Sequence, residues 1–149
     1  MRKRKIVILV ILLVIVNALL NIITPSIFGS QIDREFLESL DTSKITYQFA
    51  VLEVHPTDDE TEATLPCFST SVDGSNIAVM ITVQKDKYSY GPELQIDREW
   101  HKYKSLFSFD TVTYITKNNI EIVIIERTNK FRSKNAQLYL EEILSFAKK

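Results

Sequence analysis

The chain opens with an apolar run that contains almost no polar positions. Between Ile6 and Ile23 the only polar side chains are Asn17 and Asn21. Helical residues rise about 1.5 Å each, so a run of this length covers roughly 27 Å, close to the hydrocarbon thickness of a bilayer. The pattern predicts a transmembrane helix over residues 6–28, with a break or turn at Thr24-Pro25.

The charges before this run predict its orientation. Residues 1–5 contain four consecutive cations: Arg2, Lys3, Arg4 and Lys5. Positive flanks stay on the cytoplasmic side, so residues 30–149 are expected outside the cell membrane. The apolar core exceeds that of a typical cleaved signal peptide, and Ile27 at the −3 position does not suit cleavage after Gly29. An uncleaved signal anchor is therefore favoured, and secretion after cleavage near Gly29 remains the alternative.

The clearest local signal further along the chain is a β-hairpin. Two segments, 64–72 and 76–84, flank Asp73-Gly74, a dipeptide that supplies the positive φ angles of a tight turn. The second arm is apolar on both faces from Ile77 to Val83. Strands of that kind are central in their sheet and covered on both sides. The pattern therefore predicts a central strand with neighbouring strands on both edges and a helix on at least one face.

Three more segments are predicted to be extended. Residues 44–55 alternate apolar with polar positions, through Ile45, Tyr47 and Phe49, and read as a strand. Residues 111–116 and 120–127 form a second hairpin over Lys117-Asn118-Asn119, because Asn tolerates left-handed geometry. These predictions bring the expected number of strands to about five.

Helical spacing predicts the remaining elements. Residues 30–40 read as a short amphipathic helix that Ser30 can cap, and residues 133–147 read as a C-terminal helix. Between them, Trp100, Tyr103 and Phe107 share one helical face and predict a helix over 97–107. The expected fold is α+β, with an N-terminal transmembrane helix followed by a small, mainly antiparallel sheet on which two or three helices pack.

Composition narrows the possible partners of this outer region. Without the four N-terminal cations, 14 Lys and Arg stand against 19 Asp and Glu, a net charge of −5. A modestly acidic domain is not a general binder of nucleic acid. About 120 residues with few Gly and Pro make one ordinary domain with its own core.

Candidate chemistry is sparse. Cys67, His55 and His101 are the only cysteine and histidines, and their spacing matches no nucleophile or zinc motif. The carboxylates of residues 58–62 lack the spacing of a calcium loop and read as solvated charge. We therefore expect no catalytic, cofactor or metal-binding residue. Cys67 is expected to be shielded beneath a helix and inert.

Two groups of side chains remain as a candidate interaction surface. Tyr88 and Tyr90 lie on a loop with Gly and Pro, and Arg127, Lys130 and Arg132 form a basic patch. The expected function is a non-catalytic, membrane-anchored binding domain of the cell envelope, whose partner is a protein, peptide or polymer. Two alternatives stay open: a hydrolase or thiol enzyme that uses Cys67 with a histidine, and a structural or assembly subunit of a membrane complex. The ligand and the oligomeric state are not predicted.

Overall fold

A computed structural model describes residues 2–27, 29–50, 66–84, 90–102, 109–128 and 133–149. Within α1, side chains are described from Arg4 to Leu19. The helices are α1 (Arg2–Ile27), α2 (Arg34–Ser39), α3 (Thr42–Phe49) and α4 (Asn135–Leu144), followed by the 3-10 turn η3 (Ser145–Ala147). The strands are β1 (Cys67–Val72), β2 (Ser75–Val83), β3 (Gln95–Lys102), β4 (Phe109–Lys117) and β5 (Ile120–Thr128).

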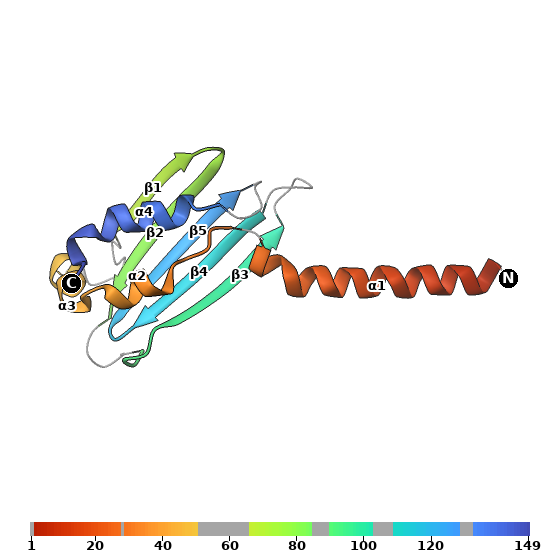
Figure 1. Ribbon diagram of the computed structural model, residues 1–149, viewed down its shortest axis with the longest axis horizontal. Helices are drawn as coiled ribbons and strands as arrows, with labels where there is room; N and C mark the ends of the chain where they lie inside the picture. Colours follow the sequence, from red (N-terminus) through yellow and green to blue (C-terminus); the bar gives the residue numbers. More distant parts are fainter. Residues whose placement is uncertain (1, 28, 51–65, 85–89, 103–108, 129–132) are drawn as a thin grey trace, which may run out of the picture.

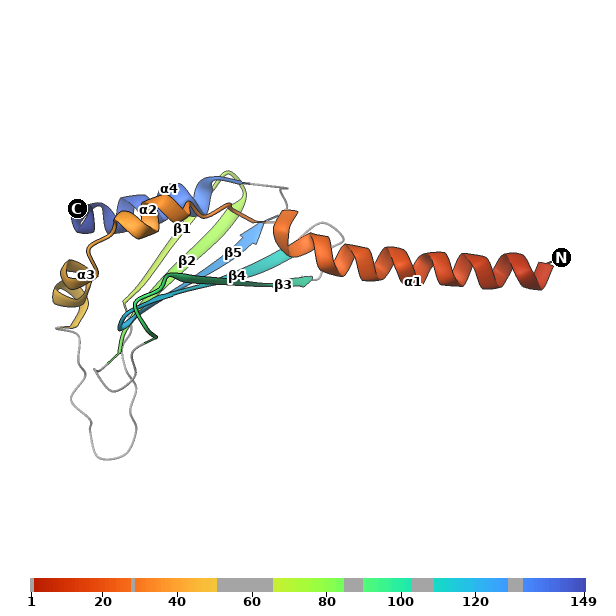
Figure 2. The ribbon, with the colours of Figure 1, turned by 60° about the horizontal axis from the view of Figure 1, so that its bottom comes forward.

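The five strands form one antiparallel sheet in the order β1-β2-β5-β4-β3. Helices α2 and α4 lie on one face of this sheet, α3 lies at one end of it, and α1 projects away from the other end (Figures 1 and 2). The α+β class, the antiparallel sheet and the packed helices are confirmed.

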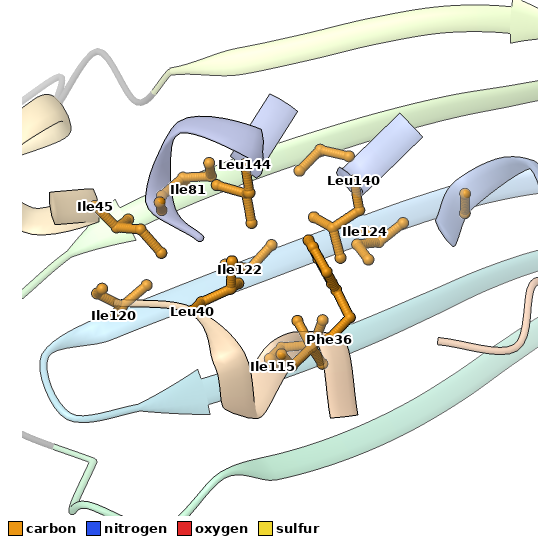
Figure 3. Close-up of a cluster of buried hydrophobic side chains, with 14 of the residues drawn as sticks. Phe36, Leu40, Ile45, Ile81, Ile115, Ile120, Ile122, Ile124, Leu140 and Leu144 are labelled. Carbon is orange, nitrogen blue, oxygen red and sulfur yellow. The ribbon is translucent and has the colours of Figure 1, made fainter. Parts of the chain in front are cut away.

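The core lies between the sheet and its helices. Isoleucines of β2 and β5 meet leucines of α4 across this interface (Figure 3). Leu140 and Leu144 are fully buried, four residues apart on α4, so one helical face supplies both. Each buried side chain of this size contributes about 1.5–3 kcal/mol through removal from water.

Both predicted hairpins are confirmed. In the first turn, Asp73 has φ 49° and Gly74 has φ 78°, the positive values that a two-residue hairpin turn requires. In the second, Asn118 has φ 54° between β4 and β5. Local turn chemistry therefore fixed the register of four of the five strands.

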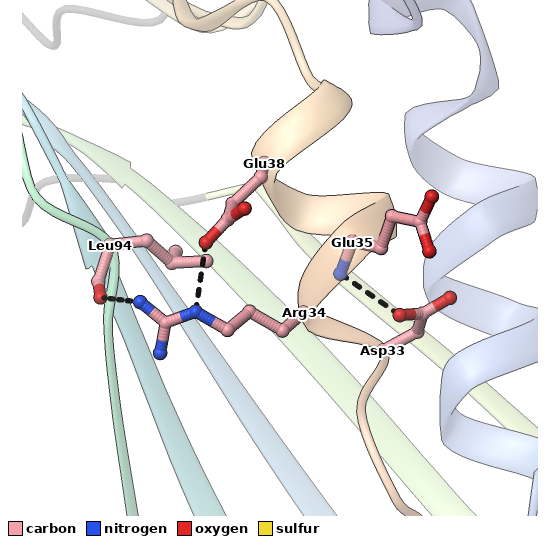
Figure 4. Close-up of polar contacts among 5 residues, drawn as sticks. All are labelled: Asp33, Arg34, Glu35, Glu38 and Leu94. Carbon is pink, nitrogen blue, oxygen red and sulfur yellow. Dashed lines mark hydrogen bonds and ion pairs between the residues drawn. The ribbon is translucent and has the colours of Figure 1, made fainter.

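The short helix α2 begins later than expected. Asp33, rather than Ser30, is the N-cap residue, and its carboxylate accepts a hydrogen bond from the Glu35 N–H at 2.9 Å. Arg34 pairs with Glu38 at 2.8 Å and donates to the Leu94 carbonyl at 3.2 Å, which ties α2 to the segment before β3 (Figure 4). Ser30 therefore does not cap α2, and its contacts are described below.

The strand predicted over residues 44–55 is wrong, because residues 42–49 form helix α3. Asp41 caps this helix by accepting from the Ser43 N–H at 3.0 Å. Ile45 is only 1% exposed and Phe49 packs on the core, whereas Tyr47 is 82% exposed. A four-residue spacing thus prevails over the alternation, and residues 51–55 lie outside the described ranges.

The helix predicted over residues 97–107 is also wrong. Residues 95–102 form the edge strand β3, paired with β4, and residues 103–107 lie outside the described ranges. Three consecutive charged residues, Asp97, Arg98 and Glu99, separate Ile96 from Trp100 on this strand. Such a composition is common at a sheet edge because charge discourages further pairing.

Helix α1 continues through Thr24-Pro25 to Ile27, so the predicted break at that position is wrong. Pro25 removes one backbone donor, and only two described residues of helix follow it. Within the part of the chain that the structure describes, none of the helices meets the combined requirement of length and hydropathy for a bilayer span.

Strand β2 is central, with β1 and β5 on its two sides, as its composition predicts. The prediction that both of its faces are covered is wrong for the described residues. Ile77, Val79 and Ile81 are buried under the helices, while Ala78 and Met80 on the other face are only half-buried.

Candidate functional site

Helix α1 carries apolar side chains that the rest of the described chain does not cover. From Ile6 to Val16, and at Leu19, the large apolar side chains are 44–63% exposed. These consecutive positions cover every side of a helix, so no stripe is reserved for the domain. Asn17 is exposed within the same helix. An apolar surface of this kind needs an apolar environment or partner.

Directly after α1, a buried polar cluster attaches the chain to the sheet. Glu126 of β5 is 3% exposed and accepts from the Ser30 N–H at 2.6 Å and from the Ser30 hydroxyl at 3.0 Å. The Ser133 hydroxyl donates to the same carboxylate at 3.0 Å. Ser30 Oγ in turn accepts from the Ala136 N–H at 2.9 Å at the start of α4. We call Ser30, Glu126, Ser133 and Arg98 the junction cluster.

Arg98 of β3 completes the junction cluster from the neighbouring strand. Its guanidinium donates to the Ser30 carbonyl at 2.6 Å and to Thr113 Oγ1 at 3.2 Å. Burial lowers the pKa of Arg98, and the nearby Glu126 carboxylate counteracts that shift. The charges of the cluster are therefore held by hydrogen bonds out of water, which suits a structural attachment more than an exposed reaction centre.

Gly29 allows this close approach. It has φ +84°, and a Cβ atom at this position would lie 2.9 Å from Thr111 Oγ1 and 3.2 Å from Thr111 Cβ. Thr111 Oγ1 is buried and has no hydrogen-bond partner among the described residues. Only glycine fits both the backbone angle and the space beside β4.

The sheet face opposite the helices, which we call the open face, has an apolar centre. Strand register places alternate residues of β2, β5 and β4 side by side on it. Its six central side chains, all half-buried, are Ala78, Met80, Val112, Tyr114, Val123 and Ile125. An antiparallel sheet with one solvated face normally alternates apolar with polar positions. These three strands depart from that rule.

Polar and charged residues surround this apolar centre. Asp97 and Glu99 lie along it on β3, while Cys67, Ser69 and Ser71 lie along it on β1. At the end nearer α1, Arg127 forms a two-pronged ion pair with Asp110, at 2.7 and 2.9 Å. Beside this pair is a shallow hollow of about 500 Å³, whose lining includes Ser69, Ser71, Asn76, Ala78, Ile125 and Arg127.

The predicted interaction residues are distributed between the open face and undescribed segments. Tyr90 receives a hydrogen bond from Gln84 at 3.1 Å; burial, and to a lesser degree the Glu121 carboxylate, raises its pKa. Glu121 lies on the open face, so Tyr90 adjoins the end farther from α1, and Arg127 lies at the nearer end. Tyr88, Lys130 and Arg132 lie outside the described residues.

The four predicted topology residues, Arg2, Lys3, Arg4 and Lys5, all lie in the first turns of α1. Arg4 and Lys5 are exposed. Nothing in the described contacts assigns them a protein partner, so their role stays a prediction.

Cys67 is exposed on edge strand β1, and the prediction that a helix shields it is wrong. Alternation places it on the open face, which carries no helix among the described residues. His101 is exposed on β3, the opposite edge of the sheet, so these two residues cannot form a nucleophile pair. His55 lies outside the described residues. Over the described ranges, no cluster of His, Cys, Asp and Glu has the arrangement of a metal site.

The sequence interpretation missed the junction cluster entirely. The sequence pattern predicts Ser30 as a helix cap, and Glu126 is one charged position in an apolar strand. A carboxylate on the inward-facing side of β5, in phase with Ile122 and Ile124, was the available signal. Such a residue requires buried donors, and sequence alone does not say which ones.

Comparisons with protein-family models, with curated proteins and with solved structures gave no match for this chain. Function is therefore inferred from the arrangement of these residues.

Proposed function

We propose that this chain is a membrane-anchored binding domain of the cell envelope, without catalytic activity of its own. In this proposal α1 crosses the bilayer with its basic end in the cytoplasm, and the sheet domain lies outside. The sequence of residues 6–23 and the cations before it support this orientation.

The observation that carries the proposal is the contrast between α1 and the rest of the described chain. The domain has a buried core of its own, yet the described large apolar side chains of α1, from Ile6 to Leu19, are exposed on every side of the helix. Hydrocarbon is the environment in which such a surface costs nothing, and helices of this composition are favoured there.

A binding role is favoured over a thiol enzyme by the separation of Cys67 and His101 on opposite sheet edges. Glu126 and the two serines of the junction cluster are buried behind α4, where substrate has no access. The open face is accessible to a partner and supports recognition without requiring chemistry.

The test uses the full chain, with an epitope tag at each end, expressed in cells. External protease should digest the C-terminal tag while the N-terminal tag stays protected. The chain should stay with membranes after alkaline extraction. Replacing Arg2, Lys3, Arg4 and Lys5 with Gln should give mixed orientation, because the charge bias that sets topology is lost.

A matched pair of substitutions distinguishes insertion of α1 in the bilayer from nonspecific association of the chain with membranes. Leu12→Lys/Ile15→Lys places two charges in α1, each costing about 2.5–3.5 kcal/mol in a bilayer centre. Leu138→Lys makes the same kind of change at an exposed position of α4. Release of the first variant, with retention of the second, supports the anchor. Full protection of both tags in intact cells, or extraction of the unaltered chain, contradicts it.

A further inference from the structure

The open face has apolar central strands, and no described helix covers it. Its three central strands carry apolar residues, as a sheet with layers on both faces does. Yet the helices that pack on the sheet lie on its other side, and no described helix covers this face (Figure 2). The strand composition is that of a three-layer arrangement, and the described chain supplies two layers.

We infer that the missing layer is a basic amphipathic helix of a partner protein, which packs across β2, β5 and β4. This inference rests on the proposed function and names the kind of partner that the domain binds. Neighbouring strands are about 4.8 Å apart, so the three central strands present a strip about 10 Å wide, which matches the diameter of a helix.

Charge identifies the partner as basic. The described residues of the open face carry four carboxylates, from Asp97, Glu99, Asp110 and Glu121, against the one guanidinium of Arg127, a net of −3. Asp97 and Glu99 are exposed and lie along the β3 side of the apolar strip. The β1 side carries only the neutral Cys67, Ser69 and Ser71. A helix with Lys or Arg along one flank of its apolar stripe complements this asymmetry.

The same charges disfavour the other occupants. A second copy of the chain would place two acidic faces against each other, and like-charge contacts across an interface cost several kcal/mol. A lipid surface is disfavoured by geometry, because α1 leaves from one end of the sheet and the open face runs alongside the helix axis (Figures 1 and 2). A spanning α1 therefore holds the open face side-on to the bilayer.

The experiment uses the full chain in nanodiscs of zwitterionic lipid and a fluorescent synthetic helix of about 20 residues, long enough to be helical. The probe has a Leu stripe with Lys on one flank. One comparison peptide has Glu in place of Lys, and a second has the Lys composition with scrambled order. Empty nanodiscs report binding to lipid alone. Only the Lys-flanked helix should bind saturably, and salt should weaken this binding because it screens exposed charges.

Paired variants locate the site. Asp97→Lys/Glu99→Lys should weaken binding of the Lys-flanked helix about tenfold, which corresponds to about 1.4 kcal/mol, and should improve binding of the Glu-flanked helix. Glu142→Lys makes a like change on exposed α4 and should have no effect. Val123→Thr, which keeps a β-branched side chain in the strand, should also weaken binding. Circular dichroism and thermal melting verify that each variant is folded.

Three results overturn the inference. The first is equal binding of the Lys-flanked and scrambled peptides by the domain. The second is a dimer of the chain in detergent solution that the Val123→Thr substitution dissociates. In that case a second copy of the chain occupies the open face. The third is binding that occurs only after deletion of residues 51–65, because the chain then covers itself. Failure of the anchor proposal is separate, since it appears as failure of the chain to enter nanodiscs.

Discussion

The two faces of the sheet are built from the same strands but have different environments. On β5, Ile122, Ile124 and Glu126 point into the helix-covered face, while Val123, Ile125 and Arg127 point to the open face. Both sets are largely apolar, so composition alone does not distinguish them. The covered face also holds the junction cluster that ties in Ser30 after α1.

The difference shows that an apolar strand pattern predicts which side chains require burial, but not which element or partner covers them. Helices of this chain satisfy the demand on the covered face. On the open face a partner can satisfy it, and until then the side chains gain only part of the available transfer free energy. The stability of the domain should therefore depend much more on the covered face.

The largest contrast should come from two adjacent isoleucines. Ile124→Ala removes a side chain that is 1% exposed and leaves a cavity under α4, at an expected cost of about 2–5 kcal/mol. Ile125→Ala makes the same change on the half-buried open face and should cost about 1 kcal/mol. Urea unfolding measures both. Equal losses would mean that the two faces are buried alike.

Substitutions at two glycines, one of them beside the junction cluster, should rank next. Gly29 and Gly91 both have positive φ, so alanine at either position carries a backbone cost of about 1–2 kcal/mol. Gly29→Ala also pushes its new methyl group against Thr111, and such overpacking adds about 1–3 kcal/mol. A Cβ at Gly91 meets nothing within 4 Å. Melting curves should show a larger loss of stability for Gly29→Ala than for Gly91→Ala. Similar losses would contradict the close contact between residue 29 and Thr111.

A third pair compares buried and exposed polar contacts on the same strand. Glu126→Gln replaces one carboxylate oxygen by a donor that faces the Ser30 N–H or the serine hydroxyls, at an expected cost of about 1–3 kcal/mol. Arg127→Gln breaks its ion pair with Asp110 on the open face and should cost at most about 1 kcal/mol. The reverse order in denaturant unfolding would place the important polar contact on the open face.

The smallest effect concerns reactivity rather than stability. Cys67 is exposed on β1, so a thiol reagent should label the folded domain nearly as fast as the denatured chain. Cys67→Ser should leave the melting temperature almost unchanged. Slow labelling that accelerates on unfolding would mean that something covers this edge of the open face.

Sequence reasoning succeeded where a signal was local. Asp73-Gly74 and Lys117-Asn118-Asn119 specify backbone angles by themselves, and the C-terminal helix repeats a simple apolar spacing. It failed for residues 44–49, where Ile45 and Phe49 fit both an alternating and a helical spacing, while Tyr47 fits only the alternating one. The structure selects the helix because Ile45 and Phe49 face the core and Asp41 caps its first turn.

The errors at β3 and at the junction have a different cause. Trp100 satisfies a helical spacing, but its segment becomes an edge strand because β4 has a free side for pairing. The junction cluster joins Glu126 to Ser30, which is 96 residues away in the sequence, and to Ser133, which is 7 residues away. Contacts of that kind depend on tertiary placement, which no local pattern encodes.

The junction cluster also has a geometric consequence for the direction in which the open face points. Only Phe28 and Gly29 separate the end of α1 from Ser30, whose backbone is held on both sides by Glu126 and Arg98. So short a connection limits how far the sheet can turn independently of α1. One residue of helix corresponds to about 100° of rotation. In the proposed membrane anchoring, the rotational position of α1 about its axis therefore sets the direction in which the open face points.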